Sequence, residues 1–140
     1  MELKKILVPV DGSVYSARAV DYAVVLALMA KGEILLIHCH RPFPAVLGEP
    51  YFQKAIDKIM KRSEELLEPY RKILQNSGVP FADRILEGPA ANAICETAKL
   101  EKADIIVMGS RGRNELEGLL LGSCTHRVLS MAPCPVLVVR

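Results

Sequence analysis

The chain has no tryptophan, and aromatic residues make up only 5% of its 140 residues. Because 51% of the residues are nevertheless hydrophobic, the core must consist mainly of valine, isoleucine, leucine and alanine. An aliphatic core of this kind favours an α/β fold over a β-sandwich. A chain of this length is typical of one domain and buries roughly 70% of its unfolded surface. We therefore expect residues 1–140 to form a single domain.

A large excess of one charge and long apolar runs are also missing. The formal net charge is +2, and no basic run is present, which argues against binding to nucleic acid or to a membrane surface. No uninterrupted apolar segment reaches the ~20 residues of a membrane span. The first residues lead directly into a strand-like run, without the apolar region of a signal peptide. We expect a cytoplasmic protein that binds neither nucleic acid nor membrane.

The cysteines lack the spacing of a metal or redox motif. They are Cys39, Cys95, Cys124 and Cys134, with no CxxC pair and no paired Cys/His ligand pattern. His38 and His40 flank Cys39, but no further ligand has suitable spacing, so no metal is expected there. In a reducing cytosol, four free thiols are the expected state.

Short apolar runs alternate with helical patterns along the chain. Strands are predicted over residues 5–10, 33–39, 79–86, 104–108 and 135–139. Helices are predicted over 16–30, over 51–76 with a kink at Pro69, from Gly88-Pro89 onward, and over 123–131, with a short helical piece inside 109–122. The predicted core positions of the first two helices are Ala17, Val20, Val24, Ala27 and Leu28, then Phe52, Ile56, Ile59, Leu66, Tyr70 and Ile73. Those of the third helix are Ile94, Cys95 and Ala98.

This alternation predicts an open five-stranded parallel α/β sheet with helices on both faces. Right-handed crossovers leave two main arrangements, a flavodoxin-like strand order 3-2-1-4-5 and a Rossmann-like order. In the order 3-2-1-4-5, ligands bind beyond the carboxyl ends of strands 1 and 4, where the order reverses. The third strand is less apolar than the others, which places it nearer an edge.

A glycine-rich segment follows the fourth predicted strand. Gly109 leaves the strand, and the small, hydroxylated residues 122–125 enter the next helix, a pattern that predicts a phosphate cradle. Neither a Walker P-loop nor GxGxxG is present. Asp11 ends the first strand at the same expected cleft. Its carboxylate suits a turn or helix cap, a ribose contact, or a metal bound to phosphates.

The glycine spacing resembles that of a known family. Gly109 and Gly112, followed after nine residues by Gly122-Ser123, match the G-2x-G-9x-G-[S/T] motif of the ATP-binding branch of the universal stress protein family. The likeness also covers residues 6–13, 35–38, 103–112 and 134–139, and so spans essentially the whole chain. The resemblance implies a flavodoxin-like (adenine nucleotide alpha hydrolase-like) fold that binds ATP, or AMP or ADP.

The resemblance also implies roles for individual residues. Pro9 and Asp11 are expected against the adenosine part, and Cys39 is expected to offer backbone groups to the adenine edge. Three further nucleotide-binding residues are expected without an assigned part, namely Val10, Met108 and Gly122. Those expected along the ribose and phosphate path are Gly109, Arg111, Gly112, Arg113, Asn114 and Glu115. Those expected to hold phosphates at the start of the next helix are Ser123, Cys124 and Thr125. Mg²⁺ or Mn²⁺ bound with the nucleotide would reach Asp11. The apolar last strand is expected to pair with a second copy in a homodimer, which would cover an exposed sheet edge.

Several functions remain open at this point. The first is a nucleotide-binding module of the stress response, favoured because no catalytic group is evident. The others are a slow metal-dependent ATPase using Asp11, a thiol sensor built on Cys124 and Cys39, and a nucleotidyl-transfer enzyme, whose usual HxGH pattern is missing. His126 is expected to be a solvated helix residue rather than a general base.

Overall fold

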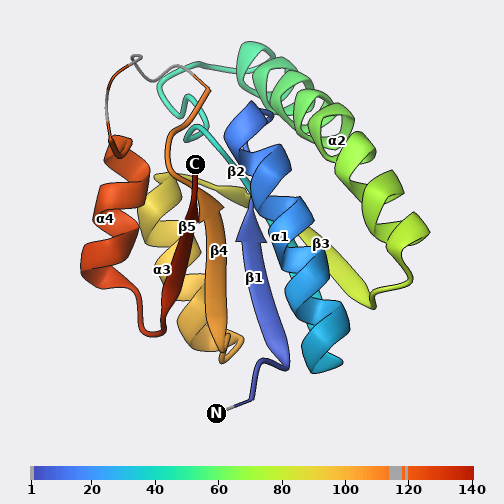
Figure 1. Ribbon diagram of the computed structural model, residues 1–140. Coiled ribbons are helices and arrows are strands. Elements are labelled where there is room, and N and C mark those ends of the chain that lie inside the picture. Colours follow the sequence, from blue (N-terminus) through green and yellow to red (C-terminus); the bar gives the residue numbers. More distant parts are fainter. Residues whose placement is uncertain (1, 114–117, 119) are drawn as a thin grey trace.

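The computed structural model describes all residues except 1, 114–117 and 119 (Figure 1). The strands are β1 (Lys5–Pro9), β2 (Glu33–His40), β3 (Phe81–Glu87), β4 (Ile105–Gly109) and β5 (Val136–Val139). They form one parallel sheet in the order β3-β2-β1-β4-β5. The helices are α1 (Val14–Ala30), α2 (Tyr51–Ser77), α3 (Ala90–Leu100) and α4 (Ser123–Met131). The predicted α/β class and strand order are confirmed, and the less apolar β3 lies at an edge.

The sheet lies between two layers of helices (Figure 1), and a hydrophobic cluster fills the space on each of its faces. Ile6 and Val8 of β1 pack with α1 and α2 on one face. Leu7, which lies between them in the sequence, packs with α3 and α4 on the other face. Successive strand residues point to opposite faces, so a strand covered on both sides must be apolar throughout. This explains the uninterrupted apolar runs of the central strands.

α1 packs on the sheet through small residues. Ser13 caps the helix by accepting a hydrogen bond from the Ser16 amide at 3.1 Å, and Lys31 ends it in the left-handed region at φ 54°. Leu28 is 57% exposed, so the prediction that it faces the core is wrong. The buried set is Ser16, Ala19, Val20, Ala23 and Ala27. These short side chains let α1 lie close to the strands. Longer side chains such as Leu28 then lie on the solvent-facing side of the helix.

The buried stripe of α2 agrees with the predicted one at Ile59 and Tyr70, but Leu67 and Leu74 are buried in place of Leu66 and Ile73. Leu67 and Leu74 are fully buried, whereas Leu66 is half-buried and Ile73 is 40% exposed. The predicted stripe did not contain Ser63, which belongs to the buried set. Its hydroxyl donates to the Ile59 carbonyl at 2.9 Å, which allows its burial. Pro69 lies on the exposed side of the helix, and the helix continues beyond it.

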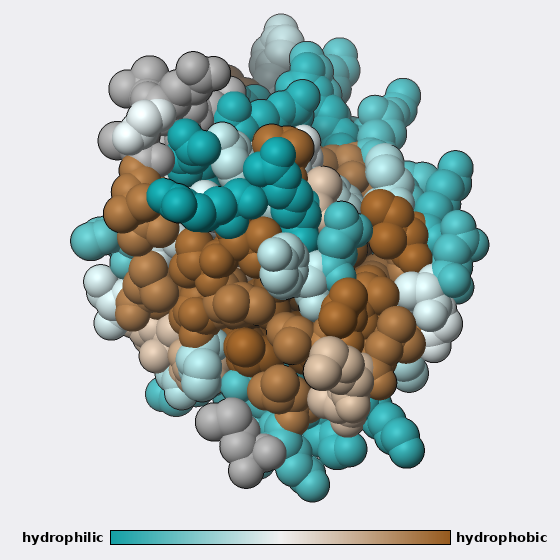
Figure 2. Space-filling view, in the orientation of Figure 1, coloured by the Kyte–Doolittle hydropathy of each residue, from teal (hydrophilic) through white to brown (hydrophobic). Residues whose placement is uncertain are grey.

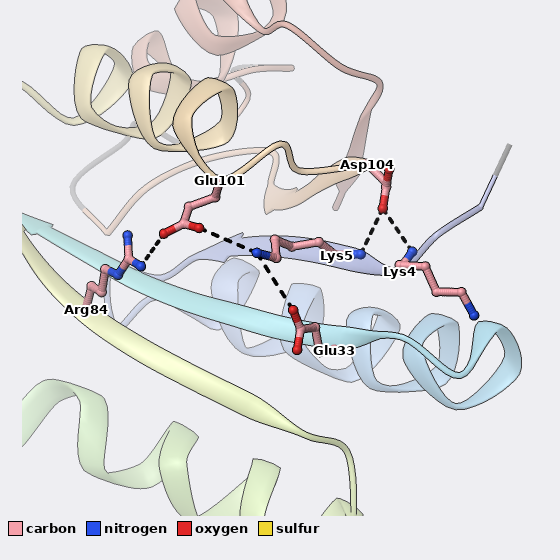
Figure 3. A network of polar contacts seen from close by, with 6 residues as sticks. All are labelled: Lys4, Lys5, Glu33, Arg84, Glu101 and Asp104. Atoms are coloured by element: carbon pink, nitrogen blue, oxygen red, sulfur yellow. Dashed lines mark hydrogen bonds and ion pairs between the residues drawn. The ribbon is translucent and has the colours of Figure 1, made fainter.

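A polar network joins the elements at the end of the sheet where β1 and β2 begin (Figure 3). The Lys4 and Lys5 amides both donate to Asp104 Oδ2 at 2.9 Å. Glu101 pairs with Arg84 and with Lys5, and both cations lower the pKa of its carboxyl, Arg84 more strongly. Within the network, Lys5 pairs with both Glu33 and Glu101. Among the described residues, no helix has the length and apolarity needed to cross a bilayer.

Candidate functional site

The carboxyl ends of β1 and β4 enclose a cavity of about 140 Å³, here called the inner cavity. It lies where the strand order reverses, as the topology predicts. The predicted residues that line it are Pro9, Val10, Asp11, Cys39, Met108, Gly109, Arg111, Gly112, Cys124 and Thr125. Sequence reasoning missed three more, namely Ser16, Ala90 and Ile94.

A larger cavity of about 560 Å³, here called the outer cavity, adjoins the inner one. The two share a wall made of Asp11, Cys39, Gly112 and Cys124. The outer cavity reaches across to α2 and is also lined by Arg113. A ligand seated in the inner cavity would therefore face a second, more polar space.

Asp11 organises the turn between β1 and α1. Its Oδ1 accepts hydrogen bonds from the Ser13 amide at 2.9 Å and the Ser16 hydroxyl at 3.0 Å. Its Oδ2 accepts from the Arg113 amide at 3.1 Å, which ties the glycine-rich segment to the turn. The expected turn-forming role of Asp11 is confirmed. A contact with ribose or a metal stays a prediction.

Ser16 connects this turn to α2. Its hydroxyl lies 2.9 Å from the Tyr70 hydroxyl and is buried, and burial raises the pKa of Tyr70. In the sequence, Ser16 stands three residues after a capping serine and resembles part of the cap. The one signal in the sequence that could have identified Ser16 as a site residue is its position on the inward face of α1.

Gly109 has a packing role that its sequence context does not reveal. A Cβ built on Gly109 would lie 2.6 Å from Tyr15 Cβ and 2.9 Å from the Tyr15 carbonyl carbon. The start of α1 therefore occupies the space where a side chain would stand. Thr125 fixes the same residue from the other side, since its buried hydroxyl donates to the Gly109 carbonyl at 2.8 Å.

Two residues of the predicted phosphate cradle, Gly122 and Ser123, lie away from the cavity lining. Gly122 precedes α4 and donates its amide to the Ser110 carbonyl at 2.7 Å. Neither Gly122 nor Ser123 lines the inner or the outer cavity as described. Asn114 and Glu115 lie outside the described residues. His126 is exposed on α4, as expected.

The cavity thiol Cys39 is held in its protonated form. Burial raises the pKa of the Cys39 thiol to about 12, and the nearby Cys124 adds to the effect. A thiol needs its thiolate form to react, so Cys39 is a poor nucleophile at neutral pH. This argues against Cys39 as the reactive group of the thiol-sensor alternative. In the part of the chain that the structure describes, no group of three or more histidine, cysteine or acidic residues is arranged to hold a metal.

Arg111 brings a positive charge to the inner cavity. Its guanidinium carbon lies 4.5 Å from the centre of the Tyr15 ring, a cation–π arrangement. Its Nε is buried and has no hydrogen-bond partner among the described atoms. Leaving a buried donor unpaired costs about 1–3 kcal/mol, so an acceptor brought by a ligand would be favourable here.

Comparisons with known proteins agree with the fold. The model of the Universal stress protein family matches residues 2–140. A universal stress protein of Thermus aquaticus is 40% identical over 138 residues, which cover 98% of each chain. The solved structure of MJ0577 from Methanocaldococcus jannaschii has a TM-score of 0.89 at 30% identity, covering 99% of this chain and 96% of that one. A solved universal stress protein in complex with cAMP has a TM-score of 0.67 at 26% identity, covering 100% and 98%.

Proposed function

Because the chain belongs to the universal stress protein family, we propose that it is an ATP-binding stress-response module of the cytoplasm that works as a homodimer. The observation that carries the proposal is the inner cavity, which lies at the reversal of strand order and is lined by residues of the glycine motif. The cAMP complex of a similar structure supports an adenine nucleotide as the ligand.

The two walls of the inner cavity suit the two parts of a nucleotide. Ala90, Ile94 and Met108 offer apolar surface for a base. Arg111 offers a buried donor to an anionic or polar group on the other side. The ligand would thus bury its base against α3 and direct its polar part toward the glycine-rich segment.

Binding rather than hydrolysis is the proposed activity. Asp11 already accepts three hydrogen bonds that hold the turn and the glycine-rich segment. A carboxylate so engaged is suited to positioning a ligand rather than to moving protons. Mg²⁺ or Mn²⁺ would enter with the phosphates, and Asp11 supplies the hard oxygen donors that such an ion prefers.

Gly112 provides the test of the nucleotide site because it lines both cavities. We expect Gly112→Val to weaken ATP binding at least about tenfold, since a branched side chain would fill the space that the ligand needs. Isothermal titration calorimetry on the purified protein measures the affinity. The control is Gly48→Val, at a loop position where no described atom lies within 4 Å of an added Cβ. Equal ATP affinity in both variants and the wild type would place the ligand elsewhere.

The proposed dimer uses the outer edge of β5. Within the described residues, β5 pairs only with β4, and Figure 2 shows hydrophobic side chains gathered on the face over these two strands. The Ile106 amide donates to the Pro135 carbonyl, and the Ser110 amide donates to the Val139 carbonyl. The backbone carbonyls of Pro135 and Val139 therefore point toward β4. By alternation, the Val138 N–H points to the open edge.

We expect Val138→Pro to raise the dimer dissociation constant at least about tenfold, because proline removes an N–H from the pairing edge. Sedimentation equilibrium measures the change. Val138→Thr keeps the N–H and serves as the control. An unchanged monomer–dimer equilibrium in the proline variant would refute pairing through this edge.

A further inference from the structure

We infer that the outer cavity receives the phosphate chain of the ligand, and that Arg62 and Arg41 make the protein prefer nucleotides with two or more phosphates over monophosphates. The inference rests on the proposed nucleotide site and adds to it a ligand class and two specificity-determining residues. Neither arginine belongs to the glycine motif.

Three arginine residues from separate parts of the chain line the outer cavity. Arg41 follows the end of β2, Arg62 lies on α2, and Arg113 lies in the glycine-rich segment. Asp11 is the one acidic residue in the described lining, and its oxygens are already hydrogen-bonded. The cavity therefore carries an excess of positive charge in a concave surface, which concentrates the field on an anion.

These arginines differ from Arg71 and Arg84 in their pairing. Arg71 binds both carboxylate oxygens of Asp83 at 3.0 Å and Glu64 at 2.6 Å. Arg84 pairs with Glu101. Arg41, Arg62 and Arg113 form no ion pair with any residue that the structure describes. No ion pair to a described residue competes with an external anion for these three side chains.

The backbone that carries each arginine is fixed. The Arg41 carbonyl lies 2.6 Å from His40 Nδ1, and the Arg113 amide donates to Asp11. Ser63, next to Arg62, is 2% exposed and anchored in α2. Each arginine thus has a hydrogen bond of the fold at or next to its backbone, so binding mainly has to order the arginine side chains themselves.

Because the two cavities share a wall, one ligand can occupy both of them. A nucleotide seated in the inner cavity would reach the outer cavity past Asp11 and Gly112. Guanidinium groups match phosphate oxygens with two parallel hydrogen bonds, and each added phosphate adds acceptors and charge. A cyclic or simple monophosphate has no chain to extend into this space. Affinity is therefore expected to rise with phosphate number.

The test compares Arg62→Ala with Lys61→Ala. Lys61 is also an exposed cation of α2, but it does not line the outer cavity, so its removal controls for the loss of one charge. Titration calorimetry uses ATP, ADP, AMP and inorganic tripolyphosphate. We expect Arg62→Ala to weaken ATP and tripolyphosphate binding about tenfold and to leave AMP affinity within about twofold, with Lys61→Ala close to the wild type.

The four probes separate failure of this inference from failure of the proposed function. Equal losses for ATP and AMP in Arg62→Ala, or equal effects of the two variants, would overturn the inference. Wild-type protein that binds AMP as tightly as ATP and ignores tripolyphosphate would also overturn it while sustaining the nucleotide site. Arg62-dependent binding of tripolyphosphate without any adenine nucleotide binding would support the anion cavity and refute the proposed function.

Discussion

Replacing Gly109 by alanine is expected to lower the free energy of unfolding by about 3 kcal/mol, even without any ligand. The added Cβ would stand 2.6 Å from Tyr15 Cβ and 3.1 Å from the Ser16 amide nitrogen. Two of the neighbouring atoms belong to the backbone of α1, so no side-chain rotation relieves the clash. The helix must shift away from β4, against which much of α1 packs.

Urea denaturation followed by circular dichroism measures this effect. Gly48→Ala is the matched control, because no described atom lies within 4 Å of the Cβ it would add and we expect its stability to change by less than about 0.5 kcal/mol. If Gly109→Ala were as stable as the control and lost only nucleotide affinity, the packing role would be wrong. The motif glycine would then serve the ligand alone.

Leu74→Ala is expected to lower the free energy of unfolding by about 3 kcal/mol, and Ile73→Ala by less than about 1 kcal/mol. Leu74 is fully buried in the layer beneath α1 and α2, so its truncation leaves a cavity. Ile73 is 40% exposed, and solvent can fill the space that its side chain leaves. The pair tests which stripe of α2 faces the sheet.

The same denaturation experiment compares the two variants at adjacent positions of one helix. Both substitutions remove a branched aliphatic side chain and introduce alanine, so the change in helix propensity favours both variants slightly. A larger loss for Ile73→Ala would restore the predicted stripe and contradict the packing of α2. Similar losses of unfolding free energy in the two variants would mean that Leu74 does not contribute more than Ile73 to the packing of α2 on the sheet.

The two glycines of the motif's first half have separable tasks. Gly109 is confined between Tyr15 and Thr125 by the packing of the protein itself. Gly112 instead faces both cavities. We therefore expect Gly109 variants to act mainly on stability and Gly112 variants mainly on ligand affinity.

The sequence predicted the helices and strands well where a pattern of neighbouring residues is sufficient to define them. Uninterrupted apolar runs identified the central strands, because residues buried on both faces of a sheet must all be apolar. Local rules failed where burial depended on a specific partner. Ser63 is buried because the Ile59 carbonyl accepts its hydroxyl, and Leu28 is exposed because α1 lies on the sheet through alanines.

The sequence by itself determined the alternation of strands and helices and the glycine-rich segment after the fourth strand, and it left two arrangements of the sheet open. Only the tertiary structure decided which groups meet at the two cavities. Ser16 lies against Tyr70 across 54 residues, and Arg113 is tied to Asp11 across 102. Arg41 and Arg62 join the outer cavity in the same way. The physical reason is that periodicity and turn chemistry act within a few residues, whereas contacts between distant segments depend on how whole helices pack on the sheet.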